Sequence, residues 1–249
     1  MDESSGGPRP PRILEQISTR WPLINDPGKF VLRYAAAIQR YLGAILRDSH
    51  AVEEVTQELL TKLLEKQIAP EQIQRGRFRD YLKAVVRNAA LSYLRREQAR
   101  PAASSEPLEY LAGRDDDPMT RAERAWNEQW REGVLARVWE DLQQHERANP
   151  AGRAYSVLRL TVEHGEDDSA DLAARLSAQV GETVRADAFR KQLSRARRLF
   201  ARFVVREVAR TLESPTPDDI EDELSDLGLH DVVELLPDDW RETRAWNDV

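Results

Sequence analysis

The sequence predicts an all-α fold built from two small helical domains joined by a flexible linker. Apolar residues recur at steps of three and four in several long stretches, as they do on the buried stripe of a helix. No stretch alternates between polar and apolar residues with period two, so no strand is predicted. A segment rich in proline and acidic residues interrupts the helical pattern near the middle of the chain, and 249 residues suffice for two cores.

The first predicted domain covers residues 26–100 and follows a disordered tail at residues 1–25, whose first part is rich in glycine, proline and serine. Three helices are expected in this domain, with Asp48 or Ser49 as the N-cap of the second. The apolar stripe of the third helix consists of Phe78, Leu82, Val85, Ala89 and Tyr93. The basic residues of that helix, Arg79 among them, are expected mostly on its other faces.

Residues 101–119 form the predicted linker, because they contain three prolines, several small residues and an acidic triplet. The second domain covers residues 120–210, and Thr120 is the expected N-cap of its long first helix. The stripe of this helix consists of Trp126, Trp130, Val134, Val138 and Leu142. Two shorter helices follow, and Asp168 or Ser169 is expected to cap the second of them.

The second domain is predicted to end in a helix-turn-helix, in which a short helix at residues 172–176 leads through a turn at Gly181 to a basic helix over residues 186–210. The apolar stripe of the basic helix consists of Phe189, Leu193, Ala196, Phe200 and Phe203. Its opposite arc carries Arg190, Lys191, Ser194, Arg195, Arg197 and Arg198. These residue types contact phosphates and guanine edges in a major groove, but an ordinary solvated basic face has the same pattern, and both interpretations stay open here.

Acidic and basic residues are segregated along the chain, although its net charge is only −7. Residues 75–100 and residues 181–210 each carry a net charge of +6. Such basic segments are typical of proteins that bind a polyanion. Residues 211–249 contain thirteen acidic and two basic residues. This acidic extension either competes with a polyanion for the basic helix or is a solubilising or separately anchored tail that does not touch the DNA-binding face.

The residue inventory argues against an enzyme or a metalloprotein. The chain has no cysteine and no glycine-rich phosphate loop, and its four histidines show no spacing typical of metal ligands. The acidic triplet at residues 115–117 lies in proline-flanked sequence that could not hold a catalytic pair in place. Without cysteine, a signal segment or an apolar stretch long enough for a bilayer, the chain is predicted to be cytoplasmic, with no cofactor and no membrane contact.

Three segments resemble conserved regions of extracytoplasmic-function sigma factors of bacterial RNA polymerase. EEVTQELLTKLLE at residues 53–65 and GRFRDYLKAVVRNAALSYLRRE at residues 76–97 are similar to the second conserved region of that family. The basic stretch at residues 190–200 is similar to the promoter-binding fourth region, although residues 176–189 are longer than the family's tight turn. The segments occur in the family's order, so the resemblance implies a region 2-like first domain and a region 4-like second domain.

The resemblance also implies binding residues. Core RNA polymerase would bind the second helix through Glu54, Gln57 and Glu58. The minus-ten promoter element would bind the third helix and the residue before it through Arg77, Arg87, Asn88, Tyr93, Arg95 and Arg96. The minus-thirty-five element would bind the basic helix through Arg190, Lys191, Ser194, Arg195 and Arg198. An acidic and amide face complements a basic helical surface, and arginines beside an aromatic ring suit single-stranded DNA.

The implied function is that of a sigma factor, which binds core enzyme and directs promoter recognition and transcription initiation without catalysis of its own. Its partners would be core RNA polymerase and promoter DNA, and the resemblance allows an anti-sigma factor as a third. A different interpretation is a helical, sigma-like regulator that sequesters a protein partner without reading DNA. The two basic patches favour the sigma factor over this regulator.

Overall fold

The computed structural model describes residues 27–64, 78–99, 117–212, 215–243 and 246. Every secondary-structure element in this part of the chain is helical, which confirms the predicted all-α class. The α-helices are α1 (Pro27–Leu46), α2 (Ser49–Leu64), α3 (Phe78–Ala99), α4 (Pro118–Ala148), α5 (Ala154–Glu163), α6 (Ser169–Val180), α7 (Ala186–Ala209), α8 (Pro217–Asp226) and α9 (Trp240–Thr243). The 3-10 helices are η5 (Pro150–Gly152) and η6 (His230–Leu235). None of these helices is long and apolar enough to cross a membrane.

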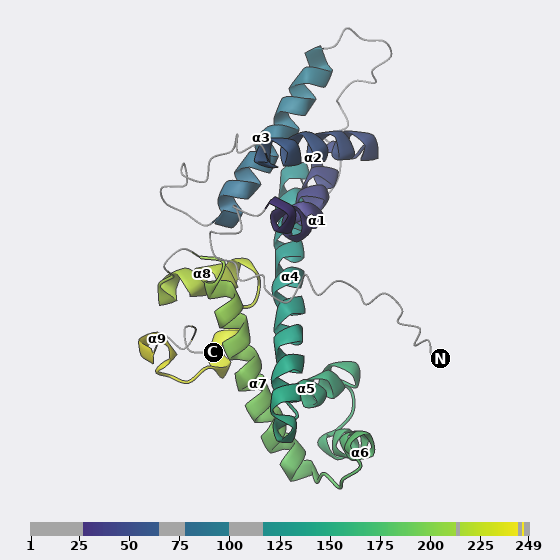
Figure 1. Ribbon diagram of the computed structural model, residues 1–249, viewed down its shortest axis with the longest axis vertical. Helices are drawn as coiled ribbons and strands as arrows, with labels where there is room; N and C mark the ends of the chain where they lie inside the picture. The colour runs from purple at the N-terminus through teal and green to yellow at the C-terminus, as the bar shows by residue number, and fades with distance from the viewer. Residues whose placement is uncertain (1–26, 65–77, 100–116, 213–214, 244–245, 247–249) are drawn as a thin grey trace, which may run out of the picture.

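Helix α4 is the long central helix of the fold (Figure 1). Its 31 residues span about 46 Å at the usual rise per residue. Helix α1 packs on its first half, and α5 and α7 pack on its second half. The predicted stripe of α4 is buried from end to end, because its apolar residues face α1 at one level and α7 at the other. One continuous core therefore extends through both groups of helices.

The start of α4 differs from the sequence prediction. The helix begins at Pro118, with Asp117 in the N-cap position, so Thr120 lies inside the helix and caps nothing. Proline fits the first helical position because its φ is preset and its missing N–H group is not needed there. The predicted linker therefore loses its last two residues to α4, while the rest of it is outside the described residues apart from Asp117. The predicted tail at residues 1–25 is also outside them.

Helices α1, α2 and α3 pack on one another beside the first half of α4. Asp48 caps α2 as predicted, because its carboxylate oxygens accept hydrogen bonds from the N–H groups of His50 and Ala51, each at 3.2 Å. In α3 the fully buried residues are Leu82, Val86 and Ala90, a row that shares only Leu82 with the predicted stripe, whose members Val85, Ala89 and Tyr93 are partly buried. Helix α3 contacts both α1 and α2, so its apolar face is wider than one stripe.

The group formed by α5, α6 and α7 closes around the second half of α4. Asp168 caps α6 as predicted, since its Oδ1 accepts hydrogen bonds from the N–H groups of Ala170 and Asp171 at 2.7 and 3.0 Å. Helix α6 continues to Val180, beyond the predicted end at residue 176, and so takes up part of the long spacing before α7. Gly181 then ends the helix in the left-handed region with φ 70°.

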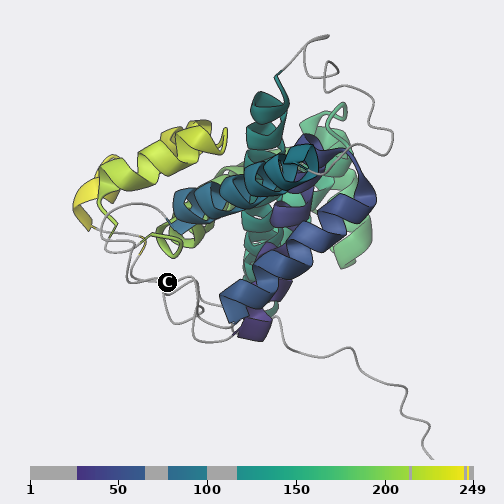
Figure 2. The ribbon, with the colours of Figure 1, turned by 90° about the horizontal axis from the view of Figure 1, so that it is seen from above.

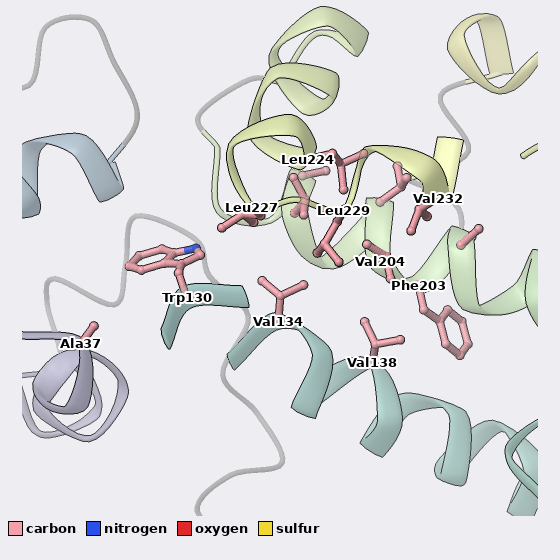
Figure 3. Close-up of a cluster of buried hydrophobic side chains, with 14 of the residues drawn as sticks. Ala37, Trp130, Val134, Val138, Phe203, Val204, Leu224, Leu227, Leu229 and Val232 are labelled. Atoms are coloured by element: carbon pink, nitrogen blue, oxygen red, sulfur yellow. The ribbon is translucent and has the colours of Figure 1, made fainter. Parts of the chain in front are cut away.

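The acidic extension folds back on α7, and we call its described part, residues 215–243 and 246, the strap. Thr216 starts α8 with a capping box: its Oγ1 accepts from the Asp219 N–H at 3.2 Å, and the Asp219 carboxylate accepts from the Thr216 N–H at 3.0 Å. Figure 3 shows the apolar residues of the strap beside those of α7 and α4. Its labelled residues include Leu224, Leu227, Leu229 and Val232 of the strap with Phe203, Val204, Val134 and Val138.

Candidate nucleic-acid interface

The predicted polymerase-binding residues lie together on α2. Glu54 and Gln57 are exposed, and Glu58 is partly buried. Their spacing of three and four residues places them on one face of the helix. The structure thus presents an acidic and amide face to solvent at this end of the molecule.

Glu58 connects this face to α3. Its Oε1 accepts a hydrogen bond from Lys62 Nζ at 2.6 Å, and its Oε2 accepts one from Arg96 Nη2 at 2.9 Å. The hydrogen bond from Arg96, followed by that from Lys62, lowers the pKa of Glu58 to about 2. The carboxylate is therefore ionised at neutral pH, and it joins a residue predicted to bind polymerase to one predicted to bind DNA.

The predicted minus-ten residues are divided between solvent and the α2–α3 seam. Arg87, Asn88 and Arg95 are exposed, and so is Arg96, although it pairs with Glu58 across the seam. Tyr93 is partly buried, and the guanidinium of Arg96 lies 5.9 Å from the centre of its ring. Arg96 is thus held between an aromatic ring and the Glu58 carboxylate, whereas the predicted residue Arg77 lies outside the described residues. The exposed residues form a basic strip on α3 next to the acidic face of α2.

The predicted minus-thirty-five residues lie on the first half of α7. Arg190, Lys191, Ser194, Arg195 and Arg198 are all exposed. Phe189 and Ala196 of the same helix are buried, so the helix separates its apolar and basic faces as predicted. Helix α6 packs against α7, and the turn between them is closed by a hydrogen bond from the Val184 N–H to Ser177 Oγ at 2.8 Å. This basic arc lies away from the strap, which packs on the other half of α7 (Figure 1).

Arg79 is the residue that sequence reasoning placed wrongly. It was expected on a face away from the stripe, but its side chain is only 3% exposed. Its Nε lies 3.2 Å from Glu223 Oε1, and its Nη2 donates a hydrogen bond to Asp226 Oδ2 at 3.0 Å. The signal was its spacing, because Arg79 precedes the buried residue Leu82 by three positions and so lies on the same row.

The described residues contain no group of three or more His, Cys, Asp or Glu side chains that could hold a metal ion. What the described part does contain is helical surface: an acidic face, a basic strip beside it, and a basic arc on a second helix. Exposed helical faces of opposite charge are suited to contact a protein partner and a polyanion.

Residues 30–100, which include α2, α3 and most of α1, match the Sigma-70 region 2 family. Over these residues the chain is similar to a domain of sigma factors, and this similarity indicates a sigma-factor-like domain of the kind that interacts with RNA polymerase and recognises promoters. The matched segment contains all the predicted polymerase-binding and minus-ten residues, whereas the predicted minus-thirty-five residues lie outside it. No curated protein and no solved structure matches the chain significantly.

Proposed function

We propose that the chain is a sigma factor of the extracytoplasmic-function type, which binds core RNA polymerase in the cytoplasm and directs it to promoters. The observation that carries this proposal is the Sigma-70 region 2 match over residues 30–100, within which an acidic face and a basic strip lie on neighbouring helices. Glu54 and Gln57 on α2 would meet a basic surface of the polymerase. An anti-sigma factor is a further partner that this function allows.

The basic strip of α3 would bind the minus-ten element as single-stranded DNA. Arg87 and Arg95 are exposed and can contact backbone phosphates, and Asn88 between them can hydrogen-bond to a base edge. Binding of unpaired bases lowers the free energy of the melted promoter, so open-complex formation requires no catalytic residue in this chain. The energy comes from stacking and phosphate contacts that duplex DNA does not offer in the same geometry.

The exposed arc of α7 would bind the minus-thirty-five element as duplex DNA. Its arginines are exposed on a helix against which α6 packs, which supports the proposed helix-turn-helix. Arginine can donate two hydrogen bonds to the O6 and N7 atoms of one guanine. We therefore propose that this arc recognises the upstream promoter element and that α3 stabilises the melted promoter.

Binding to the polymerase tests the first assignment. We expect the chain to comigrate with core RNA polymerase and to support transcription from a specific promoter. The double variant Glu54→Lys with Gln57→Ala should weaken this binding, while stability changes by only about 0.5 kcal/mol, since both positions are exposed. Glu140→Lys, an exposed charge reversal on α4, is the matched control and should bind normally. Unchanged affinity of the double variant would contradict the assignment of α2.

Arg195→Ala tests the assignment of α7. The substitution should weaken binding to the upstream promoter duplex by about 1–3 kcal/mol if Arg195 contacts a base, or lower the salt dependence if it contacts phosphate. Affinities for specific and scrambled duplexes over a range of salt concentrations separate these cases. Arg159→Ala on α5 is the control, because it removes an exposed arginine from a different helix. Comigration with polymerase without any duplex binding would instead favour the sigma-like regulator that does not read DNA.

A further inference from the structure

We propose that the strap is an internal clamp, which holds the first turn of α3 through Arg79 and competes with nucleic acid for that arginine. The strap packs on α7 and pairs with α3. It therefore connects the helix proposed to bind the minus-thirty-five element with the helix proposed to bind the minus-ten element. Figure 2 shows α8 beside α3 from a direction perpendicular to Figure 1. The clamp rests on the proposed function for its purpose but on the contacts below for its existence.

One side of the strap is anchored by apolar packing. Ile220 and Leu224 on α8 are completely buried, and Leu227 and Leu229 continue the apolar face beyond the helix. Gly228 makes the sharp change of direction between them possible, because it adopts φ 62° in the left-handed region. These residues pack on the second half of α7, so the strap leaves the basic arc of α7 exposed. The strap therefore does not act by covering the minus-thirty-five residues.

The other side of the strap carries acids that reach α3. Glu223 is 1% exposed and faces the Nε of Arg79, while Asp226 accepts the hydrogen bond from its Nη2. Asn127 of α4 lies at 3.4 Å from the Nη1 of the same guanidinium. Two carboxylates on one guanidinium offer the charge and the oxygen geometry that a phosphate would offer. While the strap is docked, Arg79 has no surface with which to bind DNA.

Competing anions can reach the contact between Arg79 and the strap. Asp226 is 51% exposed, so water and competing anions reach one half of the arrangement, although Glu223 and Arg79 are buried. Arg79 lies in the first turn of α3, the helix whose exposed residues Arg87 and Asn88 are assigned to the minus-ten element. Nucleic acid that approaches α3 therefore meets an arginine already occupied by acids, and release of the strap would add that arginine to the binding surface.

Two double variants, each of which removes two negative charges from α8, separate this clamp from general electrostatics. Glu223→Gln with Asp226→Asn removes the two carboxylates that face Arg79. Asp218→Asn with Glu221→Gln removes the same charge from the same helix, but these acids pair with Arg241 inside the strap. Because the chain has no cysteine, Ser92→Cys on α3 and His230→Cys in the strap, both exposed, can carry spin labels without competing thiols.

The experiment measures the distance between the two labels and the affinity for a single-stranded minus-ten oligonucleotide. We expect one narrow distance distribution in the parent chain and in the control, and a broad one in the Glu223 and Asp226 variant. That variant should also bind the oligonucleotide at least about fivefold more tightly, against less than about twofold for the control. If circular dichroism shows that the double variant is unfolded, Asp226→Asn alone replaces it, because this position is half-exposed. The single variant should broaden the distance distribution and raise the affinity for the oligonucleotide.

The outcomes are distinct. An unchanged distance distribution in folded variants overturns the clamp, and so does an equal gain in affinity for the variant and its control, since a shared gain reflects net charge alone. If no form of the chain binds the oligonucleotide or core polymerase, the proposed function is wrong, and the distance distributions still decide whether the strap holds α3.

Discussion

At the scale of single residues, Glu58 is the point where the two predicted binding surfaces of the first helices meet. It accepts hydrogen bonds from Lys62 on its own helix and from Arg96 on α3. Arg96 also lies over the ring of Tyr93, so three of the predicted site residues form one connected group. A nucleic acid that takes Arg96 must therefore release Glu58, which changes the charge on the face assigned to polymerase. Under the proposed function, polymerase binding and minus-ten binding would therefore be coupled through this carboxylate.

Glu58→Gln should reveal the ion pair through its pH dependence. The pKa of Glu58 is lowered from 4.5 to about 2, so its contribution to stability is complete above about pH 5 and is lost as the pH falls toward 2. The contribution is small, about 1 kcal/mol or less, because the carboxylate is 36% exposed and solvent screens the pair. Thermal unfolding of both proteins from pH 7 to pH 2 should give Tm values that differ at neutral pH and converge in acid.

Glu53→Gln provides the comparison for this measurement. Glu53 is exposed on the same helix, so its substitution makes the same change in net charge without removing the contact to Arg96. Its Tm should stay within about 1 °C of the parent at neutral pH. A difference between parent and Glu58→Gln that persisted at pH 2 would show that the effect comes from packing and not from the ionised carboxylate.

At the scale of elements, the turn between α6 and α7 determines how the basic arc is presented. Gly181 is the C-cap of α6, its N–H donates to the carbonyl of Ser177 at 3.0 Å, and α7 begins five residues later at Ala186. Arg153 donates a hydrogen bond to Glu182 at 2.7 Å and so ties this turn to the start of α5. Together with the hydrogen bond from the Val184 N–H to Ser177 Oγ, these contacts hold the turn in place, although it is longer than the resemblance to sigma factors leads one to expect.

Gly181→Ala should destabilise the protein by about 1 kcal/mol. Space is not the obstacle, since an added Cβ meets nothing within 4 Å, but φ 70° is strained for any residue with a Cβ. The Tm should fall by about 2–4 °C. Gly152→Ala is the control, because its Cβ also meets nothing and its backbone is outside the left-handed region. Equal Tm values for the two variants would mean that the turn adapts to a side chain.

The elements also show what the sequence could predict. Stripes on α4 and α7 were predicted correctly, because helical periodicity depends only on residues close in the chain. The caps at Asp48 and Asp168 are equally local. The spacing of Arg79 from Leu82 indicated the face on which it lies, but spacing alone could not predict its burial, since a lone arginine in a first turn is usually solvated unless a partner compensates its charge. One of its partners, Asp226, lies 147 residues further along the chain.

For the candidate site residues too, local sequence patterns predict exposure but not contacts between helices. Exposure of Glu54, Arg87 and Arg195 agrees with a simple helical pattern, and their assignment to polymerase and DNA stays a prediction. The engagement of Arg96 with Glu58 depends on how α2 and α3 pack, which no periodicity in either helix specifies. The pairing of the strap with α3 likewise depends on the full three-dimensional arrangement, which the pattern of acidic residues in the sequence does not specify.

At the scale of the whole molecule, α4 joins the two groups of helices into one packed body. In its first half, Trp130 stacks on Tyr34 of α1 at 5.3 Å between ring centres and on Trp126 at 5.9 Å. In its second half, Arg137 pairs with the buried Glu207 of α7 at 3.2 Å. The two groups that sequence analysis assigned to separate domains therefore share a helix, and the strap provides a second connection between them.

Trp130→Ala should consequently lower the stability of both groups together. Truncation of a buried tryptophan costs about 3–5 kcal/mol, which corresponds to a fall in Tm of about 10 °C for a chain of this size. Val138→Ala, in the half of α4 that faces α7, should cost about 2 kcal/mol in the same transition. Calorimetry should show one peak for the parent and for each variant, with calorimetric and van't Hoff enthalpies that agree. If Trp130→Ala instead shifted one of two separate peaks, the helices around α1 and those around α7 would unfold independently, and α4 would not transmit stability between them.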